Sequence, residues 1–123
     1  MFIKIMLILL TSFLIMYFWN YDLRRDVACI ELNILDLTPY MLKFDEVVQK
    51  LEVNDYKISI SKNSGFMKQE NGKFTVVGVS SIRSHIGDYW EFPFFRTSVT
   101  VFWGFNVDGR LTDVWVWKTT DAL

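Results

Sequence analysis

The most regular hydrophobic pattern in the chain runs from Thr97 to Lys118, where apolar and polar side chains alternate along two stretches separated by Asp108-Gly109. Alternation with a period of two is typical of a β-strand with one buried face. Asp-Gly between two such stretches is a strong signal for a tight β-hairpin. The pattern therefore predicts a C-terminal hairpin with one apolar face that needs a covering layer.

Two registers of this hairpin fit the sequence, and they place its tryptophans on different faces. A two-residue type I′ turn would put Trp115 and Trp117 on the same face as Phe102. A type I turn followed by a G1 bulge would pair Phe105 with Leu111 and move both tryptophans to the opposite face. We favour the second register because it separates the faces more cleanly. Its apolar face comprises Val99, Val101, Trp103, Phe105, Leu111, Trp115 and Trp117.

A helical periodicity precedes the strands. Apolar residues recur at the spacing of one helix face with charged residues between them, and Thr38-Pro39 is a typical helix start. The apolar positions are Phe44, Val47, Val48 and Leu51. We therefore expect an amphipathic helix that begins at Thr38-Pro39, ends near Asn54 and covers the apolar face of the hairpin.

Further strands are expected between this helix and the C-terminal hairpin. Residues Tyr56 to Ser61 alternate apolar and polar side chains, which is typical of a half-buried strand. The stretches Phe66–Glu70 and Lys73–Ile82 flank Asn71-Gly72, a dipeptide that favours a tight hairpin. Residues 22–37 fit a short strand and a helical turn about equally well, so we treat them as a connector.

These elements define an α+β domain at residues 38–123, in which a helical layer packs on a three- to four-stranded antiparallel sheet. A chain of 123 residues is long enough for one such domain with one core. An aromatic content of 17% indicates that this domain and the N-terminal segment are rich in large apolar side chains.

The N-terminal stretch is apolar and carries Lys4 as its single charge before Asp22. Up to position 19 it would form a helix of roughly 28 Å, close to the thickness of the hydrocarbon core of a bilayer. Tyr17, Trp19 and Tyr21 lie where interfacial aromatic side chains are expected. We therefore expect residues 1–21 to be a transmembrane anchor.

A cleaved signal peptide is the alternative interpretation of this stretch. Such a peptide ends in small residues, whereas the nearest candidate site, at residues 26–28, begins with an aspartate. Cys29 follows that site, but charged residues separate it from the apolar stretch, unlike in a lipoprotein signal. We expect an uncleaved single-pass anchor in the membrane, with the domain facing the periplasm or the cell exterior.

Aromatic and basic side chains are concentrated between Arg83 and Arg96. Gly87 and Pro93 interrupt this stretch and predict a loop or an irregular edge rather than a central strand. Aromatic residues and arginine dominate the energetic centres of protein interfaces, although the same residues could close the open end of the sheet or rest on lipid headgroups. The candidate partner-binding residues are Arg83, Tyr89, Trp90, Phe94, Phe95 and Arg96.

The sequence offers little for catalysis or for metal binding. With one histidine, His85, and one cysteine it cannot build a zinc site from several such ligands, and it has no cofactor motif. Ser84 and Asp88 lie close to His85, but chain neighbours rarely converge as a catalytic triad does, so a hydrolase using His85 is the third hypothesis. Lys plus Arg number 13 against 14 for Asp plus Glu, so nucleic acid is not an expected partner.

Two phrases of the sequence, FDEVVQKL in the predicted helix and FNVDGRL in the predicted hairpin, follow the apolar N-terminal segment in that order. In this order the chain resembles small cell-envelope proteins of the BamE/SmpA (OmlA-like) type, in outline over residues 38–118. The resemblance implies an α+β envelope protein that acts as an accessory or binding subunit. It implies no catalytic residue.

We therefore expect a non-enzymatic, membrane-anchored envelope protein that serves as a binding or assembly accessory module for another protein. A membrane-bound inhibitor or immunity protein against a toxin fits the same size and the same anchor. Both hypotheses expect no metal and no cofactor.

Overall fold

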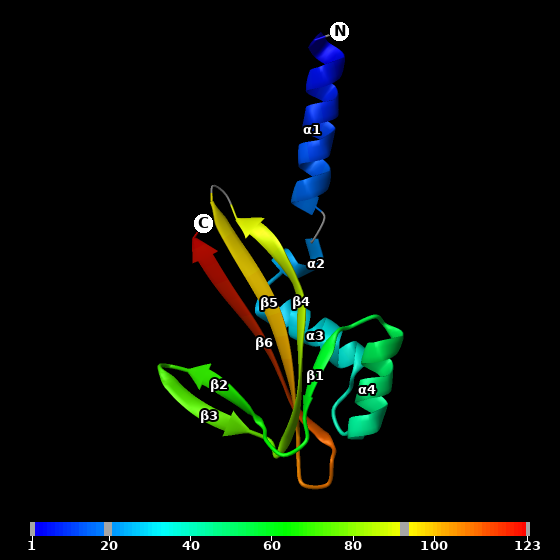
Figure 1. The fold of residues 1–123 in the computed structure, drawn as a ribbon, viewed down its shortest axis with the longest axis vertical. Helices are drawn as coiled ribbons and strands as arrows, with labels where there is room; N and C mark the ends of the chain where they lie inside the picture. The colour runs from blue at the N-terminus through cyan, green and yellow to red at the C-terminus, as the bar shows by residue number, and fades with distance from the viewer. Residues whose placement is uncertain (1, 19–20, 92–93, 123) are drawn as a thin grey trace.

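The computed structural model describes residues 2–18, 21–91 and 94–122, with the backbone alone for residues 12–18, 21–22 and 122. Its helices are α1 (Phe2–Phe18), α2 (Tyr21–Arg24), α3 (Val27–Leu37) and α4 (Phe44–Val53). Its strands are β1 (Ile58–Ser61), β2 (Phe66–Glu70), β3 (Lys73–Val77), β4 (Ser80–Glu91), β5 (Phe95–Phe105) and β6 (Leu111–Ala122). Figure 1 shows α1 standing away from the rest of the molecule.

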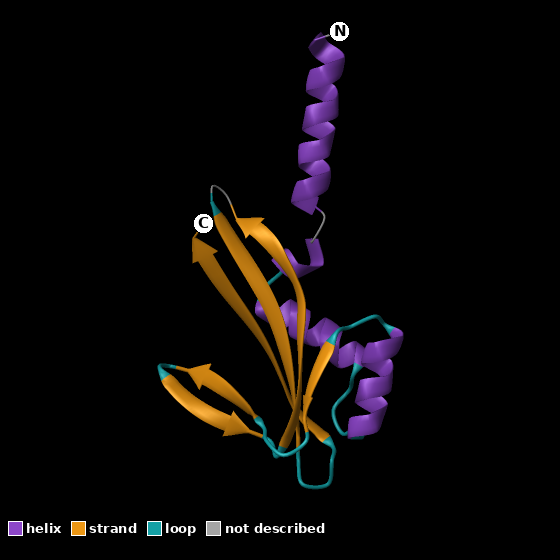
Figure 2. Ribbon diagram, in the orientation of Figure 1, coloured by secondary structure: helices purple, strands orange, loops and turns teal. Residues whose placement is uncertain are grey.

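Strands β1, β4, β5 and β6 form a four-stranded sheet in the order β1-β4-β5-β6, and β2 and β3 form a separate two-stranded ribbon. All neighbouring strands are antiparallel. Helices α3 and α4 lie on one side of the larger sheet, and the ribbon projects from the other (Figure 2). The structure therefore confirms the predicted α+β fold, with a helical layer on an antiparallel sheet.

The hydrophobic core lies between this sheet and the helices α3 and α4. Every second residue of β5 from Val99 to Phe105 is fully buried. Burial of each such side chain contributes about 1.5–3 kcal/mol before the loss of conformational entropy is subtracted. The helices contribute Ile30, Ile34, Val47 and Leu51 to the same core.

Thr38 links α3 to the centre of this core. Its hydroxyl donates to the Ile34 carbonyl oxygen at 2.8 Å and accepts the indole N–H of Trp103 at 3.0 Å. Both Thr38 and Trp103 are fully buried, so this bond satisfies the polar atom of the Trp103 side chain. Thr38 therefore ends α3. The prediction that Thr38-Pro39 starts the next helix is wrong, because α4 begins at Phe44.

The segment 39–43 is held against the C-terminal hairpin instead of joining α4. The Met41 N–H donates to the Leu111 carbonyl oxygen at 2.7 Å, and the Leu111 N–H donates to the Leu42 carbonyl oxygen at 2.8 Å. The predicted amphipathic face of α4 is confirmed, since Val47 and Leu51 are buried. Long-range hydrogen bonds thus set where this helix starts, while its hydrophobic pattern sets which side faces the sheet.

Most of the predicted connector, residues 22–37, is helical, and α3 is part of the domain. Ile30 and Ile34 follow the helical spacing and are buried in the core. Of the two alternatives left open by the sequence, the helix is correct. A strand would have placed alternate residues inward, whereas burial here follows a period of four. The folded domain therefore begins before residue 38.

The turn of the C-terminal hairpin has the geometry of the favoured register. The Asn106 N–H donates to the Arg110 carbonyl oxygen at 2.9 Å, and Gly109 has a φ of 72°. A G1 bulge requires a residue with positive φ, and glycine adopts this conformation without strain. Phe105 pairs with Leu111, as expected for a type I turn followed by this bulge.

A second bulge one residue further on changes the register of the whole strand. The pairing shifts between Gly104 and Phe105, which leaves Thr112 as the extra residue of β6. Beyond it, Phe102 pairs with Trp115. A slip of one residue exchanges the faces of a strand, so Trp115 and Trp117 lie on the side away from the core. The prediction that they join the core face is therefore wrong. Beyond the bulge the pairing is that of the other register, in which both tryptophans share a face with Phe102.

The stretch from Arg83 to Arg96, predicted as a loop or irregular edge, belongs mainly to the paired strands β4 and β5. A β-bulge between His85 and Gly87 takes up the irregularity that the glycine indicated, and the strand continues beyond it. Of the two alternatives, the loop is therefore wrong, because a bulge bends a strand without ending it. The irregular edge fits residues 85–91, which beyond the last partner of β1, Ser84, pair with β5 alone among the described residues. Pro93 lies outside the described residues.

Helix α1 exposes apolar side chains along its described part, and from Phe2 to Leu10 its large apolar residues are between 51% and 76% exposed. Among the residues that the structure describes, no helix has both the length and the apolar character needed to cross a membrane. The structure therefore gives no support to the predicted transmembrane helix. The side chains of Tyr17, Trp19 and Tyr21, predicted to be interfacial, lie outside the described residues.

Candidate functional site

The side of the four-stranded sheet away from α3 and α4, here called the open face, carries polar, charged and aromatic side chains. Paired residues of neighbouring strands project to the same side, so the register places these side chains together. The open face includes Arg83, His85 and Asp88 from β4, Ser98, Thr100 and Phe102 from β5, and Trp115 and Trp117 from β6.

A contiguous row of aromatic rings crosses the open face. Phe102 and Trp115 face each other on paired strands, with ring centroids 5.2 Å apart and an angle of 27°. Trp117 stacks on Trp115 with ring centroids 5.7 Å apart, and Phe66 of β2 also stacks on Trp115, with ring centroids 6.1 Å apart. Each such pair contributes about 0.5–1.5 kcal/mol beyond the burial of area. The row anchors the β2–β3 ribbon at one end and leaves Trp117 42% exposed at the other.

Gly104 makes room for the ring that anchors the ribbon. A Cβ atom at this position would lie 2.9 Å from Cε1 of Phe66, which is closer than carbon atoms approach in a folded protein. The missing side chain lets Phe66 rest on the backbone of the sheet, where it is buried. The ribbon is therefore docked through its first residue and projects from there.

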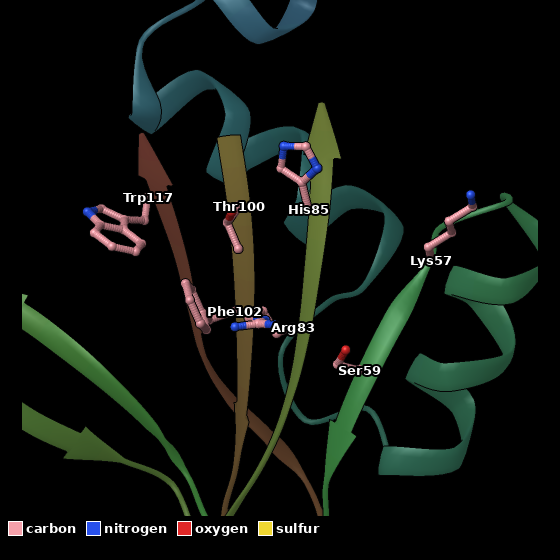
Figure 3. A pocket seen from close by; sticks show the side chains of 7 residues that line it. All are labelled: Lys57, Ser59, Arg83, His85, Thr100, Phe102 and Trp117. Carbon is pink, nitrogen blue, oxygen red and sulfur yellow. The ribbon is translucent and has the colours of Figure 1, made fainter. Parts of the chain in front are cut away.

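A groove of about 340 Å³ lies beside the exposed end of the aromatic row. Figure 3 shows Lys57 on the β1 side and His85 on β4, while the Arg83 side chain reaches from β4 over β5 to the ring of Phe102, and Trp117 lies on β6. It is lined by Lys57, Ser59, Arg83, His85, Thr100, Phe102 and Trp117. None of these lining residues is acidic. Among the described residues, neither Lys57 nor Arg83 has an ion-pair partner.

A polar cluster lies next to the groove on the open face. His85 Nε2 and Asp88 Oδ1 are 2.9 Å apart, and Arg96 Nη2 donates to the other carboxylate oxygen, Asp88 Oδ2, at 2.5 Å. Partial burial acts to raise the pKa of Asp88, but hydrogen bonds from Ser98, Arg96 and His85 outweigh it and lower the pKa to about 2. Asp88 is therefore ionised at neutral pH and holds the imidazole ring at the edge of the groove.

Ser84, His85 and Asp88, the residues considered for hydrolysis, do not converge as a triad. Ser84 is 2% exposed, and its hydroxyl donates to the Lys57 carbonyl oxygen at 2.8 Å. Successive residues of a strand point to opposite sides, so Ser84 and His85 lie on different faces of β4. A nucleophile must come within hydrogen-bond reach of its base, and this pair does not.

The described part of the chain also contains no group of three or more side chains suited to a metal ion.

Exposed aromatic side chains gather at the ends of β4 and β5, here called the tip and consisting of Trp90, Phe94 and Phe95. They are 53%, 70% and 41% exposed. Figure 1 shows this end of the sheet at the level of the C-terminal end of α1. Arg24 Nη2 of α2 donates to the Trp90 carbonyl oxygen at 2.7 Å. This bond fixes the segment that follows α1 next to the tip.

Tyr89 lies on the core side of β4 and is buried. The guanidinium carbon of Arg24 lies 4.8 Å from the centre of its ring, and Lys118 Nζ lies 5.1 Å from it. Lys118 Nζ also donates to the Arg25 carbonyl oxygen at 2.6 Å. Cations over an aromatic ring are attracted to its face. Tyr89 thus helps to hold α2 against the sheet and is not available to a partner.

The predicted partner-binding residues are brought together only in part. Trp90, Phe94 and Phe95 make the tip, and Arg96, which also belongs to the polar cluster, lies directly opposite Trp90 on the paired strand. Arg83 lies further along β4 and lines the groove, and Tyr89 is buried on the core side. The groove residues that the sequence did not indicate are Lys57, Ser59, Thr100, Phe102 and Trp117. The mixed polar face of residues 97–105 was the available signal for part of this set.

No protein-family model, curated protein or solved structure matches this chain. The resemblance to BamE/SmpA-type envelope proteins stays a prediction. What bears on function is therefore the chemistry of the open face, the tip and α1.

Proposed function

We propose that this protein is a non-enzymatic accessory module that is held at a membrane by α1 and binds another protein through the open face of its sheet. The observation that carries the proposal is the presence, in one chain, of an exposed apolar helix and of an aromatic sheet face that no helix covers. Large exposed apolar surfaces on a folded protein mark sites of contact with lipid or with other proteins.

Helix α1 supports attachment to lipid. Its 17 residues extend for about 26 Å, slightly less than the hydrocarbon core of roughly 30 Å. Lys4 near the N-terminal end of α1 can extend its ammonium group toward the headgroups. The tip lies beside the other end of the helix, and Trp90 there is of the type enriched at membrane interfaces. In this arrangement the domain lies outside the bilayer, and we propose that it faces the periplasm or the cell exterior.

The open face supports the binding of a protein. Tryptophan and arginine are over-represented among the residues that dominate binding energy in interfaces. Trp117 and Arg83 are both exposed and line the same groove. The stacked rings behind Trp117 restrict its movement, so little conformational entropy would be lost when a partner covers it.

One experiment tests both parts of the proposal. The full chain is produced in its native cells with the photocrosslinking residue benzoylphenylalanine in place of Trp117 or, as a matched control, in place of Val53, which is exposed on α4. After irradiation, membranes are floated on a sucrose gradient and the chain is detected by immunoblot. We expect the chain in the floating fraction, with protein adducts from position 117 and none from position 53.

A variant with Leu7→Glu and Leu10→Glu should leave the floating fraction, because two charges on α1 oppose its burial in lipid. Wild-type chain that stays at the bottom of the gradient would refute attachment to the membrane. Adducts of equal yield from positions 117 and 53 would refute the assignment of the open face.

A further inference from the structure

We propose that the groove on the open face binds an acidic segment of a partner protein, in which a carboxylate lies about three to four residues from an aromatic or large aliphatic side chain. This inference rests on the proposed function and specifies the ligand of the same face.

The charge of the groove points to an anionic ligand. Lys57 and Arg83 have no ion-pair partner among the described residues, and none of the lining residues is acidic. The whole chain has a formal net charge of −1, so the groove is a local basic site on a slightly acidic molecule. The planar guanidinium group of arginine matches a carboxylate with two parallel hydrogen bonds. A carboxylate side chain would therefore supply the counter-charge that the groove lacks.

The opposite side of the groove fits an apolar side chain. Phe102 and Trp117 lie there with ring centroids 6.5 Å apart, and Trp117 keeps much of its ring in contact with solvent. An aromatic or large aliphatic side chain laid on these rings would remove apolar surface from water. The hydroxyl groups of Ser59 and Thr100 between the two sides can bond to the backbone of the ligand.

The sheet sets the spacing between these two ligand groups. Arg83 is on β4 and Trp117 is on β6, with β5 between them. Arg83 pairs with Phe102, whereas Trp117 pairs with Thr100, two residues further along the sheet. Two strand spacings of about 4.8 Å and this offset of about 7 Å give a separation of roughly 12 Å, which an extended peptide covers in about three to four residues. The ligand segment is therefore expected to cross the strands in an extended conformation.

Other ligands fit this groove less well. Binding to nucleic acid grows with the number of phosphates neutralised, and the groove offers only Lys57 and Arg83 as unpaired cations among its described residues. Small-molecule pockets enclose most of the surface of their ligand. Here the side chain of His85 is 53% exposed and Trp117 is 42% exposed, so a small ligand would remain largely in water.

The test is a selection from a phage-displayed library of random dodecapeptides on the full chain in lipid nanodiscs. We expect enriched peptides to carry Asp or Glu about three to four positions from an aromatic or large aliphatic residue. Synthetic peptides of the enriched sequences should bind the Lys57→Ala/Arg83→Ala variant and the Trp117→Ala variant about tenfold more weakly than wild type. Lys50→Ala, which removes a cation on the helical side of the sheet, should bind as wild type does.

Because all of these positions are exposed, the variants should stay folded: Lys57→Ala/Arg83→Ala should keep the thermal unfolding midpoint of the wild type, and Trp117→Ala should lower it by only a few degrees. Trp117→Phe serves as a second, milder change. A selection that enriches no peptide, or peptides without an acidic residue, would overturn the proposal. Inorganic phosphate and benzoate are titrated in parallel, and binding of either in the groove without any selected peptide would also overturn it. If the chain selects such peptides but does not float with membranes in the gradient, the membrane attachment is refuted and the peptide-binding groove is not.

Discussion

The two faces of the four-stranded sheet are built from the same strands but meet different requirements. On the covered face, Val99, Val101 and Trp103 are fully buried against α3 and α4. On the open face, Thr100 and Phe102 from the same strand lie beside a groove with unpaired cations. Among the described residues, no buried side-chain nitrogen or oxygen lacks a hydrogen-bond partner. The buried polar atoms thus all have hydrogen-bond partners, while the open face carries the cations Lys57 and Arg83, which the folded structure does not need for its own stability.

The two faces therefore contribute to different properties: the covered face to the stability of the fold and the open face to the proposed binding. A side chain between the sheet and the helices contributes by burial and packing, whereas a cation with no partner contributes little to the folded state. Substitutions on the covered face should therefore unfold the protein, and substitutions in the groove should leave it folded.

The largest expected effect comes from Trp103→Ala. Removing a fully buried indole leaves a cavity and also deprives Thr38 of its hydrogen-bond donor. We expect a loss of about 3–5 kcal/mol in the free energy of unfolding. The matched change on the open face, Trp117→Ala, removes a partly exposed ring and should cost about 1 kcal/mol. Urea unfolding of the full chain in detergent micelles measures both values. Equal losses would show that the two faces do not differ as described.

Sequence patterns were sufficient for the fold class and for the covered face. The alternation from Val99 to Phe105 identifies the buried side of β5, and the spacing of Val47 and Leu51 identifies the buried side of α4. Both are local periodicities that the geometry of strands and helices imposes. The start of α4 was missed because Thr38 is engaged by Trp103, which is 65 residues away in the chain.

The open face could be predicted only in part. The mixed face of β5 was visible in the sequence, but the bulge at Thr112 that brings Trp115 and Trp117 next to Phe102 has no clear local signal. Lys57 and Trp117 are far apart in the chain and meet only through the pairing of β1, β4, β5 and β6. A site assembled by register across four strands depends on every bulge between them.

On the covered face, substitutions at Thr38 measure what its hydrogen bond to Trp103 contributes to stability. Thr38→Val keeps the shape of the side chain but leaves the indole N–H of Trp103 without its partner in the core. An unsatisfied buried donor costs about 1–3 kcal/mol. Thr38→Ser retains the hydroxyl group and should lose less than half of that amount, since it removes only one methyl group. Thermal and urea unfolding compare the two variants. A valine variant as stable as the serine variant would show that the hydrogen bond makes no net contribution.

The smallest effect concerns the polar cluster of the open face. The folded structure lowers the pKa of Asp88 from 3.8 to about 2, so its carboxylate stabilises the protein above the unfolded value and loses this contribution as the pH falls through about 2. Allowing for screening by solvent, the contribution is roughly 1 kcal/mol. Between pH 5 and pH 2 the wild type should therefore lose more unfolding free energy than Asp88→Asn does, by this amount. Urea unfolding across that range provides the measurement. If both proteins lose the same amount, Arg96 and His85 do not stabilise the Asp88 carboxylate, and the polar cluster does not hold the edge of the groove.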